Sequence, residues 1–449
     1  MSRLFGTDGV RGVANVAPMD SETVMALGRA AAQAFQRAAG RHRVLIGKDT
    51  RVSGYMLETA LATGIVSMGV DVLLVGPLPT PGVAFMTRSM RADAGVMISA
   101  SHNPYADNGI KFFGADGFKL PDAREDEIES LMKPGRLDEH RALPESLGKA
   151  SRIDDAVGRY TVYLKSCVER ECKLDGMKLV LDCANGAAYR VAPMVFGELG
   201  AAISAAGIHP DGKNINANCG SLHPENISRM VREEGADCDI AFDGDADRVI
   251  FCDEKGEVVD GDLLLAMAAF DLHARGLLKG GGIAGTIMSN LGLEKALENR
   301  GLRLYRSDVG DRYVLSEMLA RGLSLGGEQS GHVIFLDHNT TGDGILTALM
   351  ILAILLRSGK PLSSYQSLFM RFPQVLINVP VKTKRPFVEV PEIERALGQA
   401  HGELGSRGRV LLRYSGTEPK ARVMVECDDD ALCQKTAGAL AETVRKVLG

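Results

Sequence analysis

The sequence predicts an α/β protein with three similar units, followed by a smaller α+β unit. A pattern of apolar strand, polar loop, helix, glycine and second strand occurs three times, beginning near residues 44, 179 and 283. Each copy is a βαβ pattern, which favours sheets with mostly parallel strands. From about residue 373 the order changes to strand, helix, two strands and helix, which is typical of an α+β unit with a hairpin.

The expected elements follow directly from these patterns. In the repeated units we expect strands at 44–46, 72–75, 179–181, 283–287 and 302–305, and helices that end near 68, 199 and 300 before a glycine. In the tail we expect strands at 375–381, 410–414 and 421–426, and helices at 391–404 and 431–448. We place linkers at 133–151, 253–258 and 358–373.

The bulk composition limits the classes of function. Hydrophobic residues make up 45% of the chain and charged residues 24%, which is the balance of a globular protein with large cores. The net charge is −5 and no block of lysines or arginines occurs, so we expect no nucleic-acid partner and no membrane partner. The longest apolar run, 345–356, is shorter than the ~20 residues that span a bilayer, and we expect a buried core helix there.

The N-terminus and the cysteines bear on the compartment. The first residues lack the basic region and apolar stretch of a secretory signal. The eight cysteines include no C-x-x-C pair, which favours a reducing environment over disulfides or a zinc site. We therefore expect a cytoplasmic protein, and we divide its 449 residues into four domains at 1–150, 151–253, 254–370 and 371–449.

A metal site is predicted where three carboxylates alternate with small residues. The acids are Asp243, Asp245 and Asp247, followed directly by Arg248. Apolar strands are expected on both sides, so a solvated acidic turn explains the pattern poorly, and crowded carboxylates need a cation. A calcium EF-hand is excluded because its sixth position would be arginine rather than glycine. Octahedral Mg²⁺, completed by phosphate oxygen, fits the pattern better.

A nucleophile is predicted at the end of the strand around Met97. The strand ends in the letters S-A-S-H-N-P, which place Ser101 where a base or a metal can activate its hydroxyl. The alternative is a capping turn at a helix start, which this motif alone does not exclude. Lys111 follows in N-G-I-K and offers a cation near the same loop.

A third polar cluster is flanked by glycines in the letters G-G-E-Q-S-G-H. Its side chains Glu328, Gln329 and Ser330 are suited to bind hydroxyl groups of a sugar, and His332 is suited to transfer a proton. The glycines permit a close approach of the backbone to a ligand. Taken alone, the cluster is equally compatible with a polar turn.

Two further clusters point to phosphate. Arginines stand on both sides of the expected hairpin turn R-Y-S-G-T-E-P, and a plain hairpin does not require them. The phosphate cradle predicted there consists of Arg413, Ser415, Gly416, Thr417 and Arg422. At the N-terminus, the letters F-G-T-D-G-V-R-G predict a tight loop that presents Thr7 and Arg11.

The motifs, taken together and in this order, resemble those of the α-D-phosphohexomutase superfamily, and the resemblance covers essentially the whole chain. The N-terminal octet, Gln329 and the segment V-G-D-R-Y-V at 309–314 are similar to the branch that acts on glucosamine phosphates. The resemblance implies three similar α/β domains with mixed sheets and a C-terminal α+β domain like the TATA-binding protein, around a central cleft. The resemblance also implies one functional loop in each domain: the phosphoserine loop in the first, the metal-binding loop in the second, the sugar-binding loop in the third and the phosphate-binding loop in the C-terminal domain.

The resemblance also implies roles for the predicted site residues. Ser101 would be the phosphoserine and, with the three aspartates, a ligand of Mg²⁺. Arg11, Lys111, Arg248 and His332 would line the reacting end, with Lys111 or His332 as the proton carrier. Glu328 and Ser330 would hold sugar hydroxyls, Gln329 would face the 2-amino group, and the phosphate cradle would grip the phosphate that is not reacting.

The implied reaction converts glucosamine 6-phosphate to glucosamine 1-phosphate, for amino-sugar nucleotide and peptidoglycan precursor synthesis. Glucosamine 1,6-bisphosphate, or glucose 1,6-bisphosphate, is the expected phosphorylating activator. The expected partner is a small hexosamine phosphate, with a homodimer left open as the assembly. Two alternatives remain: a phosphoglucomutase or phosphomannomutase, and a non-catalytic sugar-phosphate-binding protein.

Overall fold

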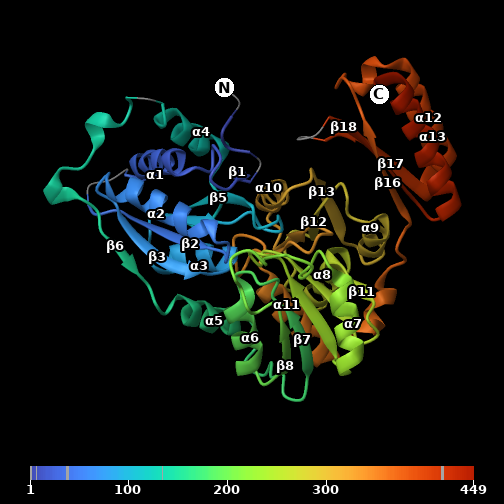
Figure 1. Ribbon diagram of the computed structural model, residues 1–449. Helices are drawn as coiled ribbons and strands as arrows, with labels where there is room; N and C mark the ends of the chain where they lie inside the picture. The colour runs from blue at the N-terminus through green and yellow to red at the C-terminus, as the bar shows by residue number, and fades with distance from the viewer. Residues whose placement is uncertain (1–2, 7, 37–39, 134, 416–418) are drawn as a thin grey trace. The chain divides into compact units, whose positions relative to one another are not determined.

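The computed structural model describes residues 3–6, 8–36, 40–133, 135–415 and 419–449, and its contacts divide the chain into two units (Figure 1). The first unit consists of Met1–Met288 and Tyr305–Gln366. The second consists of Ser289–Leu304 and Ser367–Gly449. Each unit is described by itself.

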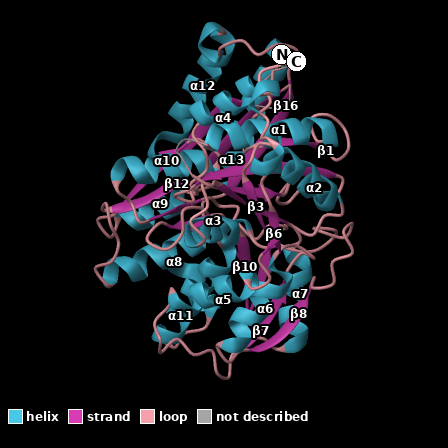
Figure 2. Cartoon of the chain, turned by 90° about the vertical axis from the view of Figure 1, so that its left-hand side faces the viewer, coloured by secondary structure: helices cyan, strands magenta, loops and turns pink. Residues whose placement is uncertain are grey.

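The first sheet of the first unit has six strands in the order β1-β5-β4-β2-β3-β6. Its strands are β1 (Val10–Val13), β2 (Arg43–Lys48), β3 (Asp71–Pro77), β4 (Ala94–Ile98), β5 (Asp107–Gly114) and β6 (Ala150–Arg152). The pairs along β4-β2-β3-β6 are parallel, whereas β5 is antiparallel to both β4 and β1, so the sheet is mixed. In Figure 2, β3 and β6 lie side by side.

Helices cover both faces of this sheet, which explains why β2 and β4 read as continuous apolar runs. They are α1 (Ser21–Phe35), α2 (Ser53–Val66), α3 (Thr80–Ser89) and α4 (Asp122–Leu131). One face carries the large core shared by α1, α2 and α4. On the other face Gly47 and Gly95 lie directly against Val83 and Thr87 of α3. The carboxyl ends of β2 and β4 therefore emerge from a rigid layer.

The second sheet has five strands in the order β11-β10-β9-β7-β8. Its strands are β7 (Lys178–Asp182), β8 (Ala202–Ala206), β9 (Cys238–Phe242), β10 (Val249–Asp253) and β11 (Val258–Val259), and the neighbouring helices are α5 (Ala156–Ser166), α6 (Ala188–Glu198) and α7 (Pro224–Glu234). β8, β7 and β9 are parallel, and β10 returns antiparallel to β9. The turn between β9 and β10 therefore lies at the carboxyl end of a buried strand.

The third sheet has four strands in the order β13-β12-β14-β15. Its strands are β12 (Gly282–Thr286), β13 (Arg303–Ser307), β14 (Leu325–Gly327) and β15 (Val333–Phe335), with helices α8 (Gly261–Ala274), α10 (Asp311–Arg321) and α11 (Gly344–Ser358). Helix α9 (Leu291–Glu298) lies between β12 and β13 in the sequence but belongs to the second unit. β14 and β15 form a hairpin. α11 is buried along most of its length, and Asp343 caps its start by accepting from Leu346 N at 3.0 Å. The expected core helix at 345–356 is confirmed.

The second unit is built on a three-stranded antiparallel sheet, β16-β18-β17. It comprises β16 (Gln374–Pro380), α12 (Pro391–Leu404), β17 (Gly408–Tyr414), β18 (Lys420–Cys427) and α13 (Asp430–Leu448). The core between helices and sheet contains Val423 and Val379. α9 belongs to this unit, where Leu291 N donates to Glu426 Oε1 at 2.9 Å.

The order of strands and helices confirms the expected α/β and α+β patterns, and the mixed sheets implied by the resemblance are present. One expected linker has a different role. Residues 253–258 turn from β10 into β11 of the same sheet, and Asp253 closes this turn by accepting from Lys255 N and Glu257 N. A short polar turn in a hairpin and a linker have the same composition, so the sequence alone did not separate them.

Among the described residues, no single helix is both long and apolar enough to cross a membrane. The segments Gly344–Ser358 and Leu362–Leu368 meet the length and composition test only as a pair, bent by 97°.

A buried acid in β9 has no apparent structural role. Asp239 is 0% exposed, and neither carboxylate oxygen has a hydrogen-bond partner among the described residues. Burial, reinforced by the charge of Asp182, raises the pKa of Asp239 to about 8. The folded chain therefore retains a proton that the unfolded chain loses near its ordinary pKa of about 3.9.

We predict that Asp239 makes the fold less stable as pH rises. Between about pH 4 and pH 8 the folded state binds one more proton than the unfolded state, so the unfolding free energy falls by at most about 1.4 kcal/mol per pH unit. Asp239→Asn should remove this dependence. Denaturant unfolding of both proteins at several pH values measures it, with Glu233→Gln at an exposed position of α7 as the control. Parallel pH dependences for wild type and Asp239→Asn would contradict the prediction.

Candidate functional site

A cleft of about 320 Å³ opens in the first unit, where loops from all three of its sheets come together. The lining residues are Asp8, Arg11, Ser101, Asp247, Arg248, Val309, Gly310, Asp311, Arg312, Tyr313, Glu328 and His332. Five of the predicted site residues line the same cavity as Ser101: Arg11, Asp247, Arg248, Glu328 and His332.

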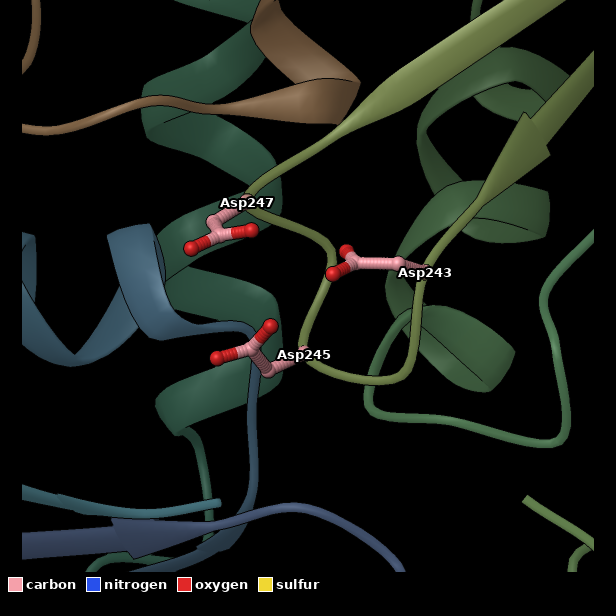
Figure 3. Close-up of side chains that lie close together, drawn as sticks. All are labelled: Asp243, Asp245 and Asp247. Carbon is pink, nitrogen blue, oxygen red and sulfur yellow. The ribbon is translucent and has the colours of Figure 1, made fainter. Parts of the chain in front are cut away.

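The three predicted metal ligands lie together in the turn between β9 and β10. Figure 3 shows the carboxylates of Asp243, Asp245 and Asp247 turned toward one another. One oxygen from each lies within 4.8 Å of the other two, and all three residues are buried. The Oδ1 atoms of Asp245 and Asp247 have no hydrogen-bond partner in the described part of the chain. Convergent carboxylate oxygens of this kind suit a hard divalent cation.

The electrostatics of the triad also favour a cation. Burial and the charges of Asp247 and Asp245 raise the pKa of Asp243 well above its usual range. Burial alone would also raise the pKa of Asp247, but His332, Lys111 and Arg248 outweigh it and hold that pKa below its ordinary value. A bound cation would relieve the repulsion at Asp243, since an opposite charge favours the ionised form. The triad is therefore suited to hold a metal ion.

Ser101 lies directly against this triad. Its Oγ donates to Asp243 Oδ2 at 2.6 Å, and the residue is 2% exposed. The backbone at Ser101 has φ of +51°, a left-handed conformation that is uncommon for a residue other than glycine. Such local strain is typical of functional loops that the surroundings hold in place.

Several buried groups hold the Ser101 loop in this conformation. Ser99 Oγ accepts from Ser101 N at 2.9 Å. The carbonyl oxygen of Ser101 accepts from Arg51 Nη2 at 3.1 Å and from Asn216 Nδ2 at 2.9 Å. Gly244 completes the contact, because a Cβ there would lie 2.5 Å from the Ser101 carbonyl oxygen. The serine loop and the acidic turn are thus in backbone contact.

Lys111 lies behind the cleft lining and joins two acids. Its Nζ donates to Asp245 Oδ2 at 3.0 Å and lies 3.2 Å from Asp8 Oδ2. Burial alone would lower the pKa of Lys111, but Asp245, Asp8 and Asp247 outweigh it and raise that pKa. Lys111 therefore keeps its proton at neutral pH and acts as a fixed cation.

His332 is 1% exposed, and both of its ring nitrogens face defined groups. Nε2 accepts from Gly342 N at 3.1 Å, so this nitrogen is unprotonated in the observed geometry. Nδ1 lies 3.6 Å from Asp247 Oδ2, which is an ion-pair distance rather than a hydrogen bond. Burial lowers the pKa of His332, but the charges of Asp247 and Asp311 outweigh it and raise that pKa. In the neutral ring the proton is therefore on Nδ1, on the side that faces Asp247.

The remaining residues of the sugar loop differ in position. Glu328 lines the cleft and accepts from Gly310 N at 3.0 Å through Oε1. Gln329 and Ser330 are not among the lining residues; the Gln329 carbonyl accepts from Gly261 N, and Ser330 is exposed. Glu328 therefore lies in the cleft, whereas the sugar contacts of Glu328, Gln329 and Ser330 stay predictions.

The predicted phosphate cradle lies in the second unit. Arg413 and Arg422 are directly opposite each other in the β17–β18 pairing, on the sheet face away from the helices, because their neighbours Leu412 and Val423 pack in the helix-covered core. Like charges directly opposite each other in a sheet are by themselves destabilising. Ser415 O accepts from Lys384 Nζ at 2.6 Å. Gly416 and Thr417 lie outside the described residues, as does Thr7.

Sequence reasoning missed several residues of the site. Asp8, Asp311 and Arg312 line the cleft, although the first belongs to the N-terminal octet and the others to V-G-D-R-Y-V. His102 Nδ1 lies 3.4 Å from Ser101 Oγ, and burial with the charges of Arg248 and Arg11 lowers the pKa of His102 to about 4. Its place next to Ser101 was the signal that could have identified it.

Comparison with known proteins assigns the chain to a family. Sequence models of the phosphoglucomutase/phosphomannomutase family match domain I at residues 2–138, domain II at 158–256, domain III at 260–372 and the C-terminal domain at 376–443. The chain belongs to the phosphoglucomutase/phosphomannomutase family. It is therefore a phosphohexomutase, an isomerase that transfers a phosphoryl group within a sugar phosphate. The exact domain boundaries at 150, 253 and 370 stay predictions.

Among similar proteins, the phosphoglucosamine mutase of Citrifermentans bemidjiense is 57% identical over 449 residues, covering 100% of this chain and 99% of its own. That of Myxococcus xanthus is 56% identical over 446 residues, covering 99% of this chain and 97% of its own.

Solved structures share the fold at lower identity. A family protein of Burkholderia thailandensis has a TM-score of 0.82 at 24% identity, with 99% of this chain and 97% of that chain covered. The N-acetylphosphoglucosamine mutase of Aspergillus fumigatus, in complex with GlcNAc-6P and magnesium, has a TM-score of 0.68 at 18% identity, with 99% and 96% covered.

We predict that Gly244→Ala separates the acidic turn from the serine loop. The new Cβ would overlap the Ser101 carbonyl oxygen, so one loop must shift, and a displacement of this size costs about a hundredfold in kcat/KM. Gly158→Ala at an exposed position of α5 is the control, because a Cβ there meets nothing within 4 Å. Steady-state kinetics and thermal midpoints of both variants make the comparison. Wild-type kcat/KM in Gly244→Ala would show that the close contact is not needed.

Proposed function

We propose that this chain is a phosphoglucosamine mutase that interconverts glucosamine 6-phosphate and glucosamine 1-phosphate through a phosphorylated Ser101. The observation that carries the mechanism is the 2.6 Å hydrogen bond from Ser101 Oγ to Asp243 of the buried carboxylate triad. The choice of amino sugar is supported by full-length relatives of 56–57% identity that are phosphoglucosamine mutases. The product would feed amino-sugar nucleotide and peptidoglycan precursor synthesis.

The transfer itself exchanges one phosphorus–oxygen bond for another. The bond from phosphorus to Ser101 Oγ breaks while phosphorus bonds to O1 of the sugar, and the proton of the O1 hydroxyl passes to a base. This gives an enzyme-bound 1,6-bisphosphate, which must turn in the cleft before Ser101 takes back the phosphoryl group from O6. Glucosamine 1,6-bisphosphate or glucose 1,6-bisphosphate would therefore serve as the activator that first phosphorylates Ser101.

The residues of the cleft supply positioning and charge stabilisation, which phosphoryl transfer chiefly requires. We assign Mg²⁺ to Asp243, Asp245, Asp247 and Ser101; when bound, it would stabilise negative charge on the transferring phosphoryl group. Arg11 and Arg248, which line the cleft, would hold the phosphoryl oxygens, and Lys111 behind the lining would add its positive charge while it holds Asp245 and Asp8. We favour His332 over Lys111 as proton carrier, because Lys111 keeps its proton between Asp245 and Asp8.

Binding of the rest of the substrate is assigned to two other groups of residues. Glu328 would bind sugar hydroxyls, with Ser330 and Gln329 beside it, and Gln329 would face the 2-amino group. The phosphate that is not reacting would bind to Arg413, Ser415, Gly416, Thr417 and Arg422 of the second unit. A homodimer and a cytoplasmic location stay predictions.

Phosphoglucomutase or phosphomannomutase activity is the second candidate, because the family models include both. The deciding experiment is a coupled assay of glucosamine 6-phosphate, glucose 6-phosphate and mannose 6-phosphate, each with and without added 1,6-bisphosphate. We expect the highest kcat/KM with glucosamine 6-phosphate, since glucose 6-phosphate retains a hydroxyl at C2 and should be disfavoured only about ten- to a hundredfold. A preference for glucose or mannose 6-phosphate would contradict the amino-sugar assignment and leave the mutase chemistry intact.

We predict that Ser101→Ala abolishes turnover. Removing the phosphoryl acceptor should lower kcat by at least about a thousandfold, while stability stays close to wild type. Intact mass after incubation with glucose 1,6-bisphosphate should show one added phosphoryl group on wild type and none on the variant. Ser99→Ala is the control and should be phosphorylated, although it loses the bond to Ser101 N. Phosphorylation of Ser101→Ala at another residue would refute the assignment.

We predict that chelation stops the enzyme and that Mg²⁺ restores it. Calcium should bind but support little turnover, because it accepts looser geometry at longer distances. Binding has a readout of its own: Mg²⁺ at about 100 times its Kd should stabilise the wild-type fold by about 2.7 kcal/mol. Asp245→Asn should lose most of this stabilisation. Undiminished activity in EDTA, or equal stabilisation of Asp245→Asn, would show that the triad is not the metal site.

A further inference from the structure

A series of ion pairs runs behind the wall of the cleft and includes a lysine that has no assigned role. Lys111 Nζ lies 3.0 Å from Asp245 Oδ2 and 3.2 Å from Asp8 Oδ2. Lys119 Nζ in turn donates to Asp8 Oδ1 at 2.5 Å and to Asp311 Oδ2. Positive and negative groups therefore alternate from the acidic triad to the start of α10.

Lys119 joins parts of the chain that are far apart in sequence. Asp8, which it contacts, precedes β1, whereas Asp311 is the first residue of α10. Both carboxylates line the cleft, but Lys119 does not belong to the lining. Its role is therefore to hold groups that face the substrate rather than to face the substrate itself.

The next residue of α10, Arg312, also joins this helix to the segment after β5, in this case through α4. Arg312 forms ion pairs with Asp122 and with Glu125, the latter at 3.3 Å. The guanidinium of Arg312 is 21% exposed and Glu125 only 7%, so this pair is better shielded from water than an ordinary surface pair. Two successive residues of α10 are thus tied to the segment that follows β5.

Each end of the Lys119 bridge controls groups used by the proposed reaction. Asp8 forms an ion pair with Arg11 and lies 3.2 Å from Lys111, so it fixes two cations of the reacting end. Asp311 begins the helix directly after Gly310, whose N–H holds the Glu328 carboxylate. Lys119 therefore connects the group that binds phosphoryl oxygens to the group that binds the sugar.

Without Lys119 the two carboxylates would oppose each other. Burial alone would raise the pKa of Asp311, and the charge of Asp8 raises it further, whereas Lys119 lowers it. The same lysine, with Lys111 and Arg11, holds the pKa of Asp8 below its usual range against the effect of burial. Removing one partner of a shielded ion pair leaves an uncompensated charge, which drives the remaining groups apart.

We infer that Lys119 is a positioning residue of the mutase reaction, which holds residues 309–313 of the cleft wall against Asp8. It keeps the Glu328 side of the cleft and the Arg11–Lys111 side at the separation that one sugar phosphate spans. This inference rests on the proposed function, and it concerns the binding of sugar phosphate rather than the chemistry at Ser101.

The test is a double-mutant cycle on the bridge. Its members are wild type, Lys119→Met, Asp311→Asn and the double variant, with Lys119→Arg as the conservative variant. Lys165→Met is the control, because Lys165 pairs with Glu198 between α5 and α6 and touches no residue of the cleft lining. For each protein we would measure Kd of glucosamine 1-phosphate by calorimetry, KM and kcat for glucosamine 6-phosphate, and the thermal midpoint.

We expect each single variant to raise Kd and KM about tenfold while kcat falls less than about threefold, because the lost interaction positions substrate groups and does not touch the reacting atoms. The double variant should be no weaker than Lys119→Met, since the contact that Asp311→Asn breaks is already lost in Lys119→Met. Lys119→Arg should recover most of the affinity, and Lys165→Met should match wild type.

Three results would overturn the inference. Opposite shifts of Kd in Lys119→Met and Asp311→Asn would mean that only the change in net charge matters. Purely additive effects in the double variant would mean that the two residues act separately. Lower kcat and a lower thermal midpoint with unchanged Kd would indicate a structural role only. If Lys119→Met does not fold, an unchanged Kd in Asp311→Asn is sufficient to overturn the inference. Failure of the proposed function is distinguishable, because wild type would then neither bind nor turn over glucosamine phosphates.

Discussion

The crowding of three buried carboxylates beside Ser101 is the constraint on which the rest of the site depends. Asp243, Asp245 and Asp247 are all buried, and their mutual repulsion with burial raises the pKa of Asp243. Such a cluster is stable only when cations compensate it from several sides. Lys111 and Arg248 supply part of this compensation from the protein, at 3.0 Å and 3.8 Å from their nearest acids. The remaining deficit makes the triad suited to bind a cation.

The chain meets this constraint by joining short, strained turns to rigid strands. The acidic turn follows fully buried β9, and its Ala246 has φ of +55°, while Ser101 at the end of β4 has φ of +51°. Neither conformation is favourable for an isolated residue with a Cβ. Both persist because neighbouring groups hold them, as Arg51 does for the Ser101 carbonyl oxygen. Stability is thus given up locally so that the hydroxyl, the carboxylates and the cations meet within hydrogen-bonding distance.

Much of this arrangement follows from sequence, because periodic patterns predict strands and the ends of parallel strands meet at one edge of a sheet. The repeated βαβ pattern and the positions of Ser101 and the aspartates were predictable for that reason. Asp8, Lys119 and Arg51 were not, since their roles depend on pairing between residues that are distant in sequence and carry no local pattern. Glu328 lines the cleft while its neighbours Gln329 and Ser330 do not, because a tight turn points successive side chains in different directions.

Pairing each cation with an acid explains how a chain of net charge −5 can handle phosphate. Lys111 lies between Asp245 and Asp8, and Arg248 lies 3.8 Å from Asp247. An unpaired lysine in water would have to shed its hydration and change conformation as charge develops on the transferring group. Cations already fixed by buried acids need little reorganisation at that moment, which is the condition under which electrostatic stabilisation is most effective. The acids of the cleft therefore contribute to phosphoryl transfer although they carry the same sign of charge as the substrate.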